Sequence, residues 1–280
     1  MKLSISYAIL LLFLNIVAKS QCLKVKDIPF KEGEKLVYTV KYNLGFLWFD
    51  AGEVIFLVDT IKNKKGKKFF HFVSTGRSYK SYDWIFKVRD KYEVITFEKN
   101  LRPIYFHRKT SEGGYNVENI FRFDYKNDKI YMKISHSDTL PYKDTINKIE
   151  CLRDALSSAY LLRSLGLSNL EKGMKINLDM LLDGKKFNIY VKFIGKEVIE
   201  INDSTKVKTL KFTTKTIESS IFRSGENLFV WVTDDKNKIP IRVEAYILVG
   251  KVIVDLVSYE GLKYSTKSFI LINENKRKKN

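Results

Sequence analysis

Residues 175–193 read KINLDMLLDGKKFNIYVKF, and this stretch decides the fold class. Its central dipeptide, Asp183-Gly184, is a strong signal for a two-residue β-hairpin turn, because that turn needs positive φ angles that Asp tolerates and Gly adopts freely. The second half has apolar residues at every other position, namely Phe187, Ile189, Val191 and Phe193. A period of two places these residues on one face of a strand. The stretch therefore predicts a pair of antiparallel strands.

The same signals recur along most of the chain. Apolar and polar residues alternate over Leu36–Tyr42, and Val54–Val58 is a continuous apolar run, as expected for a strand that is covered on both faces. Turn residues such as Lys126–Asp128 separate the strands about every ten residues. This spacing favours antiparallel meanders over βαβ units. No Pro-, Ser- or Gly-rich linker divides the chain, so we expect one β-rich domain over residues 21–265.

One segment has helical spacing instead. From Ile149 to Leu165 the chain carries its apolar residues three or four positions apart, at Ile149, Leu152, Leu156, Ala159 and Tyr160. Asp154 lies in an early turn and Arg163 in the last turn, where each charge complements the helix dipole, and Gly166 follows as a cap. We therefore expect a mainly β protein: a single large antiparallel curved sheet or incomplete barrel with one central amphipathic helix at about residues 149–165.

The first twenty residues have the layout of a secretory signal peptide. Met1-Lys2 is a short basic start, Leu3–Ala18 carries no charge, and the small residues Ala18 and Ser20 suit cleavage before Gln21. The uncharged stretch is shorter than the roughly 20 residues that a membrane-spanning helix needs. We expect cleavage and no transmembrane span afterwards, with an uncleaved anchor as the alternative.

The composition is that of a globular protein with a large excess of positive charge. The chain has 280 residues, 45% of them hydrophobic, and 50 Lys and Arg against 32 Asp and Glu give a formal net charge of +18. This balance excludes a disordered or collagenous chain. The charge favours an anionic partner, although scattered lysines most often form a solvated face. The basic segment 266–280 is expected to be a flexible tail.

The two cysteines leave a question open. Cys22 and Cys151 would both remain after cleavage, and an oxidising compartment permits a disulfide between them. Against this pairing, Cys22 lies next to the new N-terminus, and Cys151 stands where the expected helix begins and a small buried thiol also fits. Both the bonded and the free state remain possible.

The residues show no catalytic or metal-binding constellation. His71, His107 and His136 each lie in or beside a strand, without a second ligand at metal-binding spacing, and no cofactor motif is present. Asp234–Asn237 is the densest acidic turn, but its lysine favours a polar turn over a calcium loop. A hydrolase with Cys151 as nucleophile and His107 as base is the enzymatic alternative.

Aromatic residues gather at two expected loops. The residues concerned are Tyr42, Phe46, Trp48 and Phe49 in the first loop and Tyr82 and Trp84 in the second. Aromatic rings offer a large contact area with a polar edge, so both loops are suited to line the mouth of a concave sheet and to bind an apolar or glycan ligand. The alternative for each single residue is a place in the core. We predict that these six residues form a ligand-binding site.

Three segments of the chain, taken in order, resemble a known family. These segments are Phe30–Tyr38 with Ala51-Gly52, Asp154–Ser157 with Tyr160 and Arg163, and Trp231–Asp235 with Ile239–Val243. They resemble the opening, the central helix and a later hairpin of domain-of-unknown-function family 3108, which comprises exported proteins of Gram-negative bacteria. The resemblance covers residues 28–262. It implies a β-rich envelope protein, supplies no established activity, and suggests a fold similar to that of the periplasmic lipoprotein carriers.

These observations favour a non-enzymatic exported protein of the periplasm or cell envelope. Its expected ligand is a lipid, lipopolysaccharide, envelope polymer or other amphiphilic or anionic molecule, and neither a cofactor nor a nucleic acid is expected. The alternatives are an envelope hydrolase and a structural or assembly protein without a ligand. The sequence leaves the identity of the ligand and the oligomeric state open.

Overall fold

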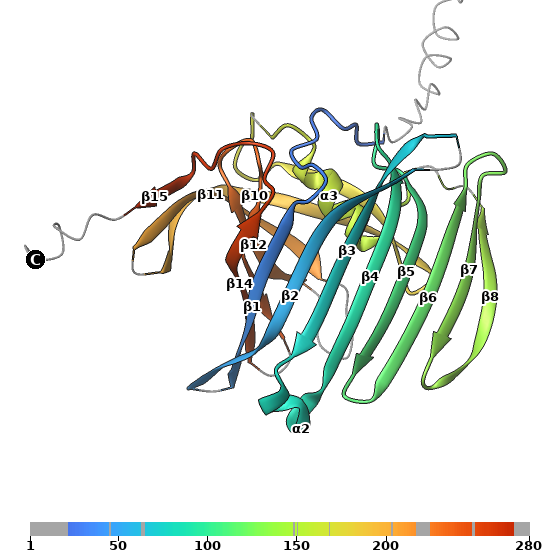
Figure 1. The fold of residues 1–280 in the computed structure, drawn as a ribbon, viewed down its shortest axis with the longest axis horizontal. Helices are drawn as coiled ribbons and strands as arrows, with labels where there is room; N and C mark the ends of the chain where they lie inside the picture. The colour runs from blue at the N-terminus through green and yellow to red at the C-terminus, as the bar shows by residue number, and fades with distance from the viewer. Residues whose placement is uncertain are drawn as a thin grey trace, which may run out of the picture.

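The computed structural model describes residues 22–271, apart from residues 45, 63–64, 148, 150, 168, 203, 217–224 and 248–249. The expected signal segment, residues 1–20, and residues 272–280 of the expected tail lie outside the described residues. The described chain is dominated by strands (Figure 1).

The strands are β1 (Lys35–Leu44), β2 (Leu47–Lys62), β3 (Lys68–Ser78), β4 (Val88–Phe97), β5 (Pro103–Glu112), β6 (Tyr115–Asp124), β7 (Lys129–His136), β8 (Thr139–Asn147), β9 (Lys175–Leu182), β10 (Lys185–Asn202), β11 (Thr205–Thr216), β12 (Gly225–Thr233), β13 (Pro240–Tyr246), β14 (Lys251–Glu260) and β15 (Phe269–Leu271). The helices are η2 (Lys80–Tyr82), α2 (Asp83–Phe86) and α3 (Ala155–Arg163).

The strands form one antiparallel sheet that consists of two successive meanders. Strands β1 to β8 lie side by side in chain order, α3 follows, and β9 to β14 form the second meander. The last of these, β14, pairs with β1, from Lys35 opposite Glu260 to Asn43 opposite Lys251. The sheet curves around α3 (Figure 1) and is not closed, because β8 and β9 are its two edges. The expected fold class is confirmed.

The stretch that decides the fold class forms the predicted hairpin. Strands β9 and β10 pair outwards from Leu182 opposite Lys185. Asp183 and Gly184 take φ angles of 46° and 76°, as a primed two-residue turn requires.

The apolar run in β2 is not covered on both faces, so that prediction is wrong. Val58 is 1% exposed, whereas Leu57, which points to the opposite face, is 36% exposed. The reason is that Val54, Phe56 and Val58 pack into the hydrophobic clusters of the interior, while the alternate side chains do not.

The central helix is shorter than predicted, because it begins at Ala155 and not near residue 149. Asp154 caps it: its backbone is extended, and its carboxylate accepts a hydrogen bond from the Ser157 N–H at 2.8 Å. The residue before the cap, Arg153, bonds to β9 through both its backbone N–H and its carbonyl oxygen. This strand-like pairing competes with helix formation, and helical periodicity alone does not reveal it.

Helix α3 lies between the two halves of the curved sheet. Leu156 and Tyr160 pack into the cluster that contains Phe72 of β3, and the rings of Tyr160 and Phe72 stack with their centroids 3.8 Å apart. Leu161 packs against Ile176 of β9 in a second cluster. Helix α3 therefore joins both walls of the sheet. Among the described helices, none has the length and apolar character of a membrane span.

A buried ion pair connects the last turn of α3 to Glu34, the residue that precedes β1. The guanidinium of Arg163 donates two hydrogen bonds to the Glu34 carboxylate, at 2.6 and 3.0 Å, and the side chains are 6% and 0% exposed. It also donates to the carbonyl of Asn237 at 3.1 Å. Burial is the largest single effect and lowers the pKa of Arg163, but the charge and hydrogen bonds of Glu34, together with Tyr160 and Tyr38, raise it by more in sum. The pKa therefore lies above its ordinary value, and the guanidinium stays charged.

The sheet extends beyond residue 265, after which the expected tail begins. Strand β15 pairs with β11, with Phe269 opposite Val207 and Leu271 opposite Thr205. The segment 266–271 is therefore part of the fold, because Phe269 also packs against the hydrophobic cluster around Val207.

Candidate functional site

The concave face of the sheet, defined here as the face that points towards α3, carries a continuous row of valines. The row consists of Val40 on β1, Val254 on β14, Val243 on β13 and Val230 on β12. The register places each valine opposite the next. All four members of this valine row are half-buried. On the same face, nearer to α3, Tyr38 and Leu256 are only 2% and 6% exposed. Burial therefore decreases away from α3, and the valine row borders a part of the concave face that α3 leaves uncovered.

The other wall of the concave face carries a polar row, which consists of Tyr92, Arg108 and Asn119. The register places them opposite one another on β4, β5 and β6. The Arg108 Nη1 and Asn119 Nδ2 atoms donate to the carboxylate of Asp183 at 2.7 and 2.9 Å. The tip of the β9–β10 hairpin thus rests on the polar row. The Arg108 guanidinium also lies over the ring of Tyr92, 5.7 Å from its centroid.

The polar row has hydrogen-bonding capacity that no described residue uses. Arg108 Nε, Asn119 Oδ1 and the Nε2 atom of the nearby concave residue His136 are buried and without a hydrogen-bond partner in the described part of the chain. Buried polar atoms are normally paired, and leaving one unpaired costs about 1–3 kcal/mol. A water molecule or a polar group of a ligand can use this capacity.

Asp90 lies on the same wall, one concave position beyond Tyr92. Burial and the charge of Glu112 raise the pKa of Asp90 to about 7, although a hydrogen bond from the Ser111 N–H and the charge of Arg108 act in the opposite direction. Folded Asp90 is therefore protonated over much of the range in which an unfolded aspartate, with a pKa of about 3.9, is already ionised.

This difference predicts that Asp90 makes the protein less stable as the pH rises. Between about pH 4 and pH 7 the folded state binds more protons at Asp90 than the unfolded state does, so the free energy of unfolding falls with increasing pH. We expect the urea midpoint of Asp90→Asn, measured relative to that of the original protein, to be higher at pH 8 than at pH 5. The control is the exposed Asp50→Asn. An equal difference between Asp90→Asn and the original protein at both pH values would contradict the prediction.

The structure brings half of the predicted aromatic residues together beside the valine row. Tyr42 follows Val40 on the concave face of β1 and lies opposite Phe49, with their ring centroids 6.0 Å apart. Tyr82, from η2, lies 6.1 Å from Phe49. Two loops that are distant in sequence therefore meet, as the prediction of one site requires. Their binding of a ligand remains a prediction.

The other three predicted residues do not take part in this contact and are exposed. Phe46 is 90% exposed, Trp48 50% and Trp84 83%. The indole Nε1 of Trp84 donates to the Ser81 carbonyl at 2.9 Å, which fixes the ring at the surface. These residues are neither core nor lining of the concave face.

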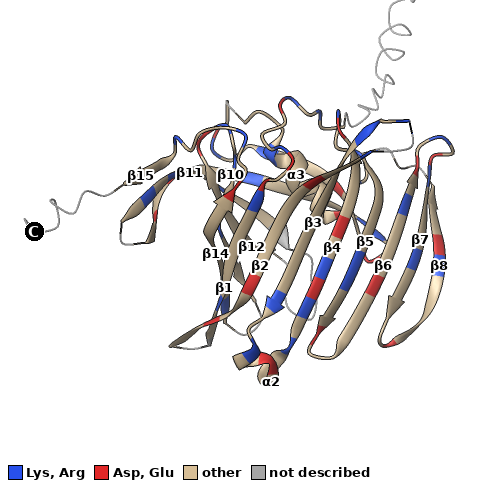
Figure 2. Cartoon of the chain, in the orientation of Figure 1, with Lys and Arg blue, Asp and Glu red and all other residues tan. Residues whose placement is uncertain are grey.

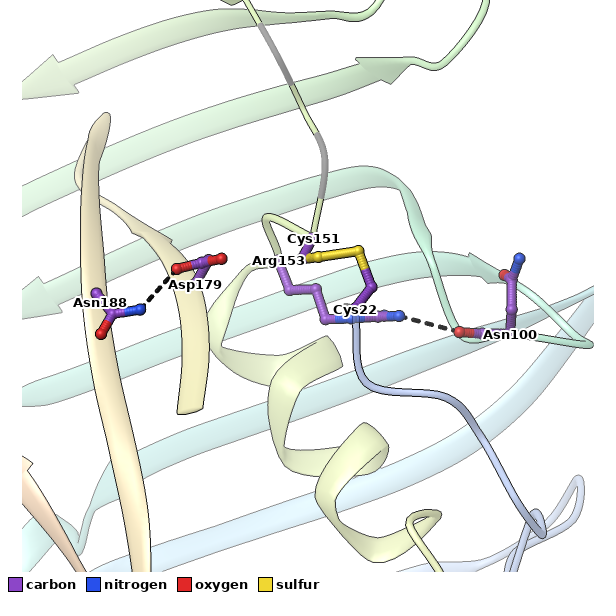
Figure 3. Close-up of a disulfide and its surroundings, with 6 residues drawn as sticks. All are labelled: Cys22, Asn100, Cys151, Arg153, Asp179 and Asn188. Carbon is purple, nitrogen blue, oxygen red and sulfur yellow. Dashed lines mark hydrogen bonds between the residues drawn. A yellow bond between two sulfur atoms is a disulfide. The ribbon is translucent and has the colours of Figure 1, made fainter. Parts of the chain in front are cut away.

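Cys22 and Cys151 form a disulfide, which answers the question that the sequence leaves open (Figure 3). Their Cα atoms are 5.1 Å apart, and the bond joins the N-terminal segment to the residues that precede α3. A cavity of about 850 Å³ lies beside the bond, and Arg153 is among the residues that line it. Because its sulfur is bonded, Cys151 has no free thiol for the nucleophilic role of the hydrolase alternative.

Charged residues of both signs are interspersed along the strands (Figure 2). His107 Nε2 lies 3.0 Å from the Glu118 carboxylate, and His71 Nε2 lies 3.4 Å from Glu93. Both histidine side chains are partly exposed at the strand surface, as predicted for the histidines, whereas His136 has its Nε2 atom buried on the concave face. The two pairs are partly open to solvent, so they contribute little stability.

The acidic turn between β12 and β13 is a polar turn, as predicted. The Asp235 carboxylate accepts hydrogen bonds from the Thr233 hydroxyl at 2.9 Å and the Asn237 N–H at 3.0 Å. Asp234 pairs with Lys196 at 2.8 Å. The carboxylates thus stabilise the turn itself.

Sequence reasoning missed the polar row. Arg108 follows Phe106 at the strand period of two, and Asn119 precedes Phe121, so both polar residues occupy positions that the pattern assigns to the interior. A polar residue at an inward position is a usable signal, because burial of a polar group is costly unless a partner is present. The partner, Asp183, comes from a distant hairpin and could not be read from the local pattern.

Together, the fold and the site define a class of protein: an open antiparallel sheet, wrapped around one helix, with a partly uncovered apolar concave face. The sequence profile of a family described as "Protein of unknown function (DUF3108)" matches residues 37–257. The chain belongs to this family, as its resemblance indicated.

The fold is similar to that of a solved structure. This is the β-barrel-like protein of domain of unknown function DUF1849 from Brucella abortus, with 10% sequence identity, a TM-score of 0.51, and coverage of 89% of this chain and 100% of that chain. At this identity the likeness shows the fold alone. A candidate exported protein with a YmcC-like fold from Bacteroides fragilis has 9% identity, coverage of 85% and 100%, and a TM-score of 0.30, which supports no argument. None of the curated proteins matches the sequence.

Proposed function

We propose that this protein is a non-enzymatic exported protein of the periplasm or cell envelope that binds a lipid or another amphiphile on its concave face. The observation that carries the proposal is the half-buried valine row on one wall, with the polar row on the other. An acyl chain gains free energy when it covers exposed aliphatic surface. A polar or anionic headgroup finds donors in Arg108 and its neighbours. An amphiphile matches both walls at once.

The aromatic contact beside the valine row suits the entrance of such a site. Tyr42, Phe49 and Tyr82 combine a large apolar area with hydroxyl groups, which is the composition expected where a ligand passes from water into an apolar environment. We assign these three residues to the rim of the site.

Export is supported by two independent features. Residues 1–20 have the charge and size pattern of a signal peptide. The Cys22–Cys151 disulfide suits an oxidising compartment, because disulfides persist mainly outside the cytosol. A similarity to the periplasmic lipoprotein carriers would fit both features and remains a prediction.

A matched pair of substitutions on β14 tests the binding proposal. Val254 points to the concave face and its neighbour Ile253 to the convex face, and both are half-buried. An amide placed against an acyl chain loses hydration without gaining a partner, so we expect Val254→Asn to weaken binding of a dansyl-labelled fatty acid about fivefold or more. Ile253→Asn should leave the affinity within about twofold. Fluorescence titration measures both, and equal losses in the two variants would contradict the proposal.

Native mass spectrometry of protein recovered from a bacterial periplasm provides a second test. We expect a co-purifying hydrophobic species that organic solvent removes. A protein that is free of ligand and also fails to bind the labelled fatty acid would favour a structural or assembly role instead.

A further inference from the structure

Six exposed apolar side chains lie on two neighbouring loops at one end of the sheet (Figure 1). They are Phe46, Leu47 and Trp48 at the β1–β2 turn and Trp84, Ile85 and Phe86 in α2, and they are 90%, 51%, 50%, 83%, 62% and 52% exposed. We call this set the apolar tip. Single exposed apolar residues are ordinary, but a contiguous group of large ones marks an interaction surface.

The α2 part of the apolar tip is held in place by contacts with neighbouring strands. Asp83, at the start of α2, accepts hydrogen bonds from Ser78 and from Arg89, which anchor the loop to β3 and β4. Phe86 lies against the backbone of Gly113 in the β5–β6 turn, where a Cβ atom would come within 2.4 Å of the ring. The loop is thus anchored to β3, β4 and the β5–β6 turn, while Trp84 and Ile85 stay 83% and 62% exposed. Such an arrangement presents apolar groups to a partner without a large ordering cost.

The charges around the apolar tip favour an anionic partner. Lys80 and Lys87 flank α2, both are exposed, and neither forms an ion pair within the described part of the chain. The acid between them, Asp83, is paired with Arg89. Asp50 is the exposed acid at the neighbouring hairpin. Over the whole chain the formal charge is +18, so the long-range field also attracts anions.

We propose that the apolar tip docks onto the surface of a lipid bilayer that contains anionic lipid. Trp and Phe prefer the boundary between headgroups and acyl chains, and flanking lysines bind anionic headgroups. The tip lies at the end of the sheet where the valine row is uncovered, so docking brings the concave face next to the membrane. The proposal does not depend on a bound ligand, because the docking residues are separate from the valine row and the polar row.

Vesicle binding tests the proposal. Protein recovered from a bacterial periplasm is mixed with vesicles of phosphatidylglycerol and phosphatidylethanolamine and with vesicles of phosphatidylcholine, and sedimentation gives the bound fraction. We expect strong binding to the anionic vesicles only. The double variant Phe46→Ser/Trp84→Ser should lower the partition coefficient about tenfold or more, because each change removes one large apolar side chain from the contact. Lys80→Ala/Lys87→Ala should lower it at low salt and have little effect at high salt.

Leu271→Ser is the matched control, because Leu271 is 78% exposed but lies on β15, away from the tip. Thermal melts confirm that each variant is folded. A Trp48→Phe/Trp231→Phe background leaves Trp84 as the reporter, and brominated lipid should quench its emission. The proposal is overturned if Leu271→Ser loses as much binding as the tip variant, if Trp84 is not quenched, or if ultracentrifugation shows that the tip instead joins two copies of the chain.

Discussion

Arg163→Ala should destabilise the protein by about 3–5 kcal/mol, because it leaves a fully buried carboxylate without its counter-charge. Glu34 is 0% exposed, and the Arg163 guanidinium donates one hydrogen bond to each oxygen of the Glu34 carboxylate. The substitution also opens a space at the end of α3, next to Phe30, over which the Arg163 guanidinium lies at 5.3 Å. Urea unfolding followed by circular dichroism measures the loss.

Two comparisons show whether burial of the charge is the cause. Arg77→Ala removes an arginine that is 64% exposed and paired with Glu53, and the expected loss is below about 1 kcal/mol. Glu34→Leu/Arg163→Met replaces the whole pair with apolar side chains and should be closer to the original stability than Arg163→Ala alone. A double variant that is less stable than the single variant would show that the pair contributes mainly through its hydrogen bonds and packing, contrary to the prediction.

Removal of the disulfide should lower the free energy of unfolding by about 2–5 kcal/mol. Cys22 and Cys151 are 129 positions apart, so the bond closes a long loop and strongly restricts the unfolded chain. In the folded state it holds the N-terminal segment next to the residues that precede α3. At the other end of the helix, the Lys26 N–H donates to the carbonyl of the C-cap residue Ser164 at 2.9 Å. We expect a lower thermal midpoint for Cys22→Ser/Cys151→Ser.

Reduction supplies the internal control. Dithiothreitol should lower the thermal midpoint of the original protein towards that of Cys22→Ser/Cys151→Ser and should leave the double variant unchanged. If the original protein keeps its midpoint after complete reduction, verified by thiol titration, then the bond does not contribute to stability and the prediction fails.

The sequence predicted the elements better than their ends or their surroundings. The Asp183-Gly184 hairpin was predictable because its turn chemistry is local. The start of α3 was not, because Arg153 pairs with β9, and a partner from another part of the chain overrides the apolar period. For the same reason the run at Val54–Val58 indicated a strand correctly but gave no information about whether both of its faces are covered.

The candidate site was predictable only in part. The two aromatic loops were visible as clusters of residues, and the structure places Tyr42, Phe49 and Tyr82 in contact. Their division into a rim and an exposed tip depends on the direction of each side chain, which a loop sequence does not encode. The polar row was missed, because the partner of Arg108 and Asn119 lies on the distant β9–β10 hairpin.

The sequence by itself determined a mainly β chain with one central helix, because strand and helix periods and turn residues act over a few neighbouring positions. Only the tertiary structure decided that Glu34 meets Arg163 and that Cys22 meets Cys151, each pair 129 positions apart. It also decided that valines from four strands form one row. These contacts depend on strand order and on the curvature of the sheet, which result from the packing of the whole chain and leave no local pattern in it.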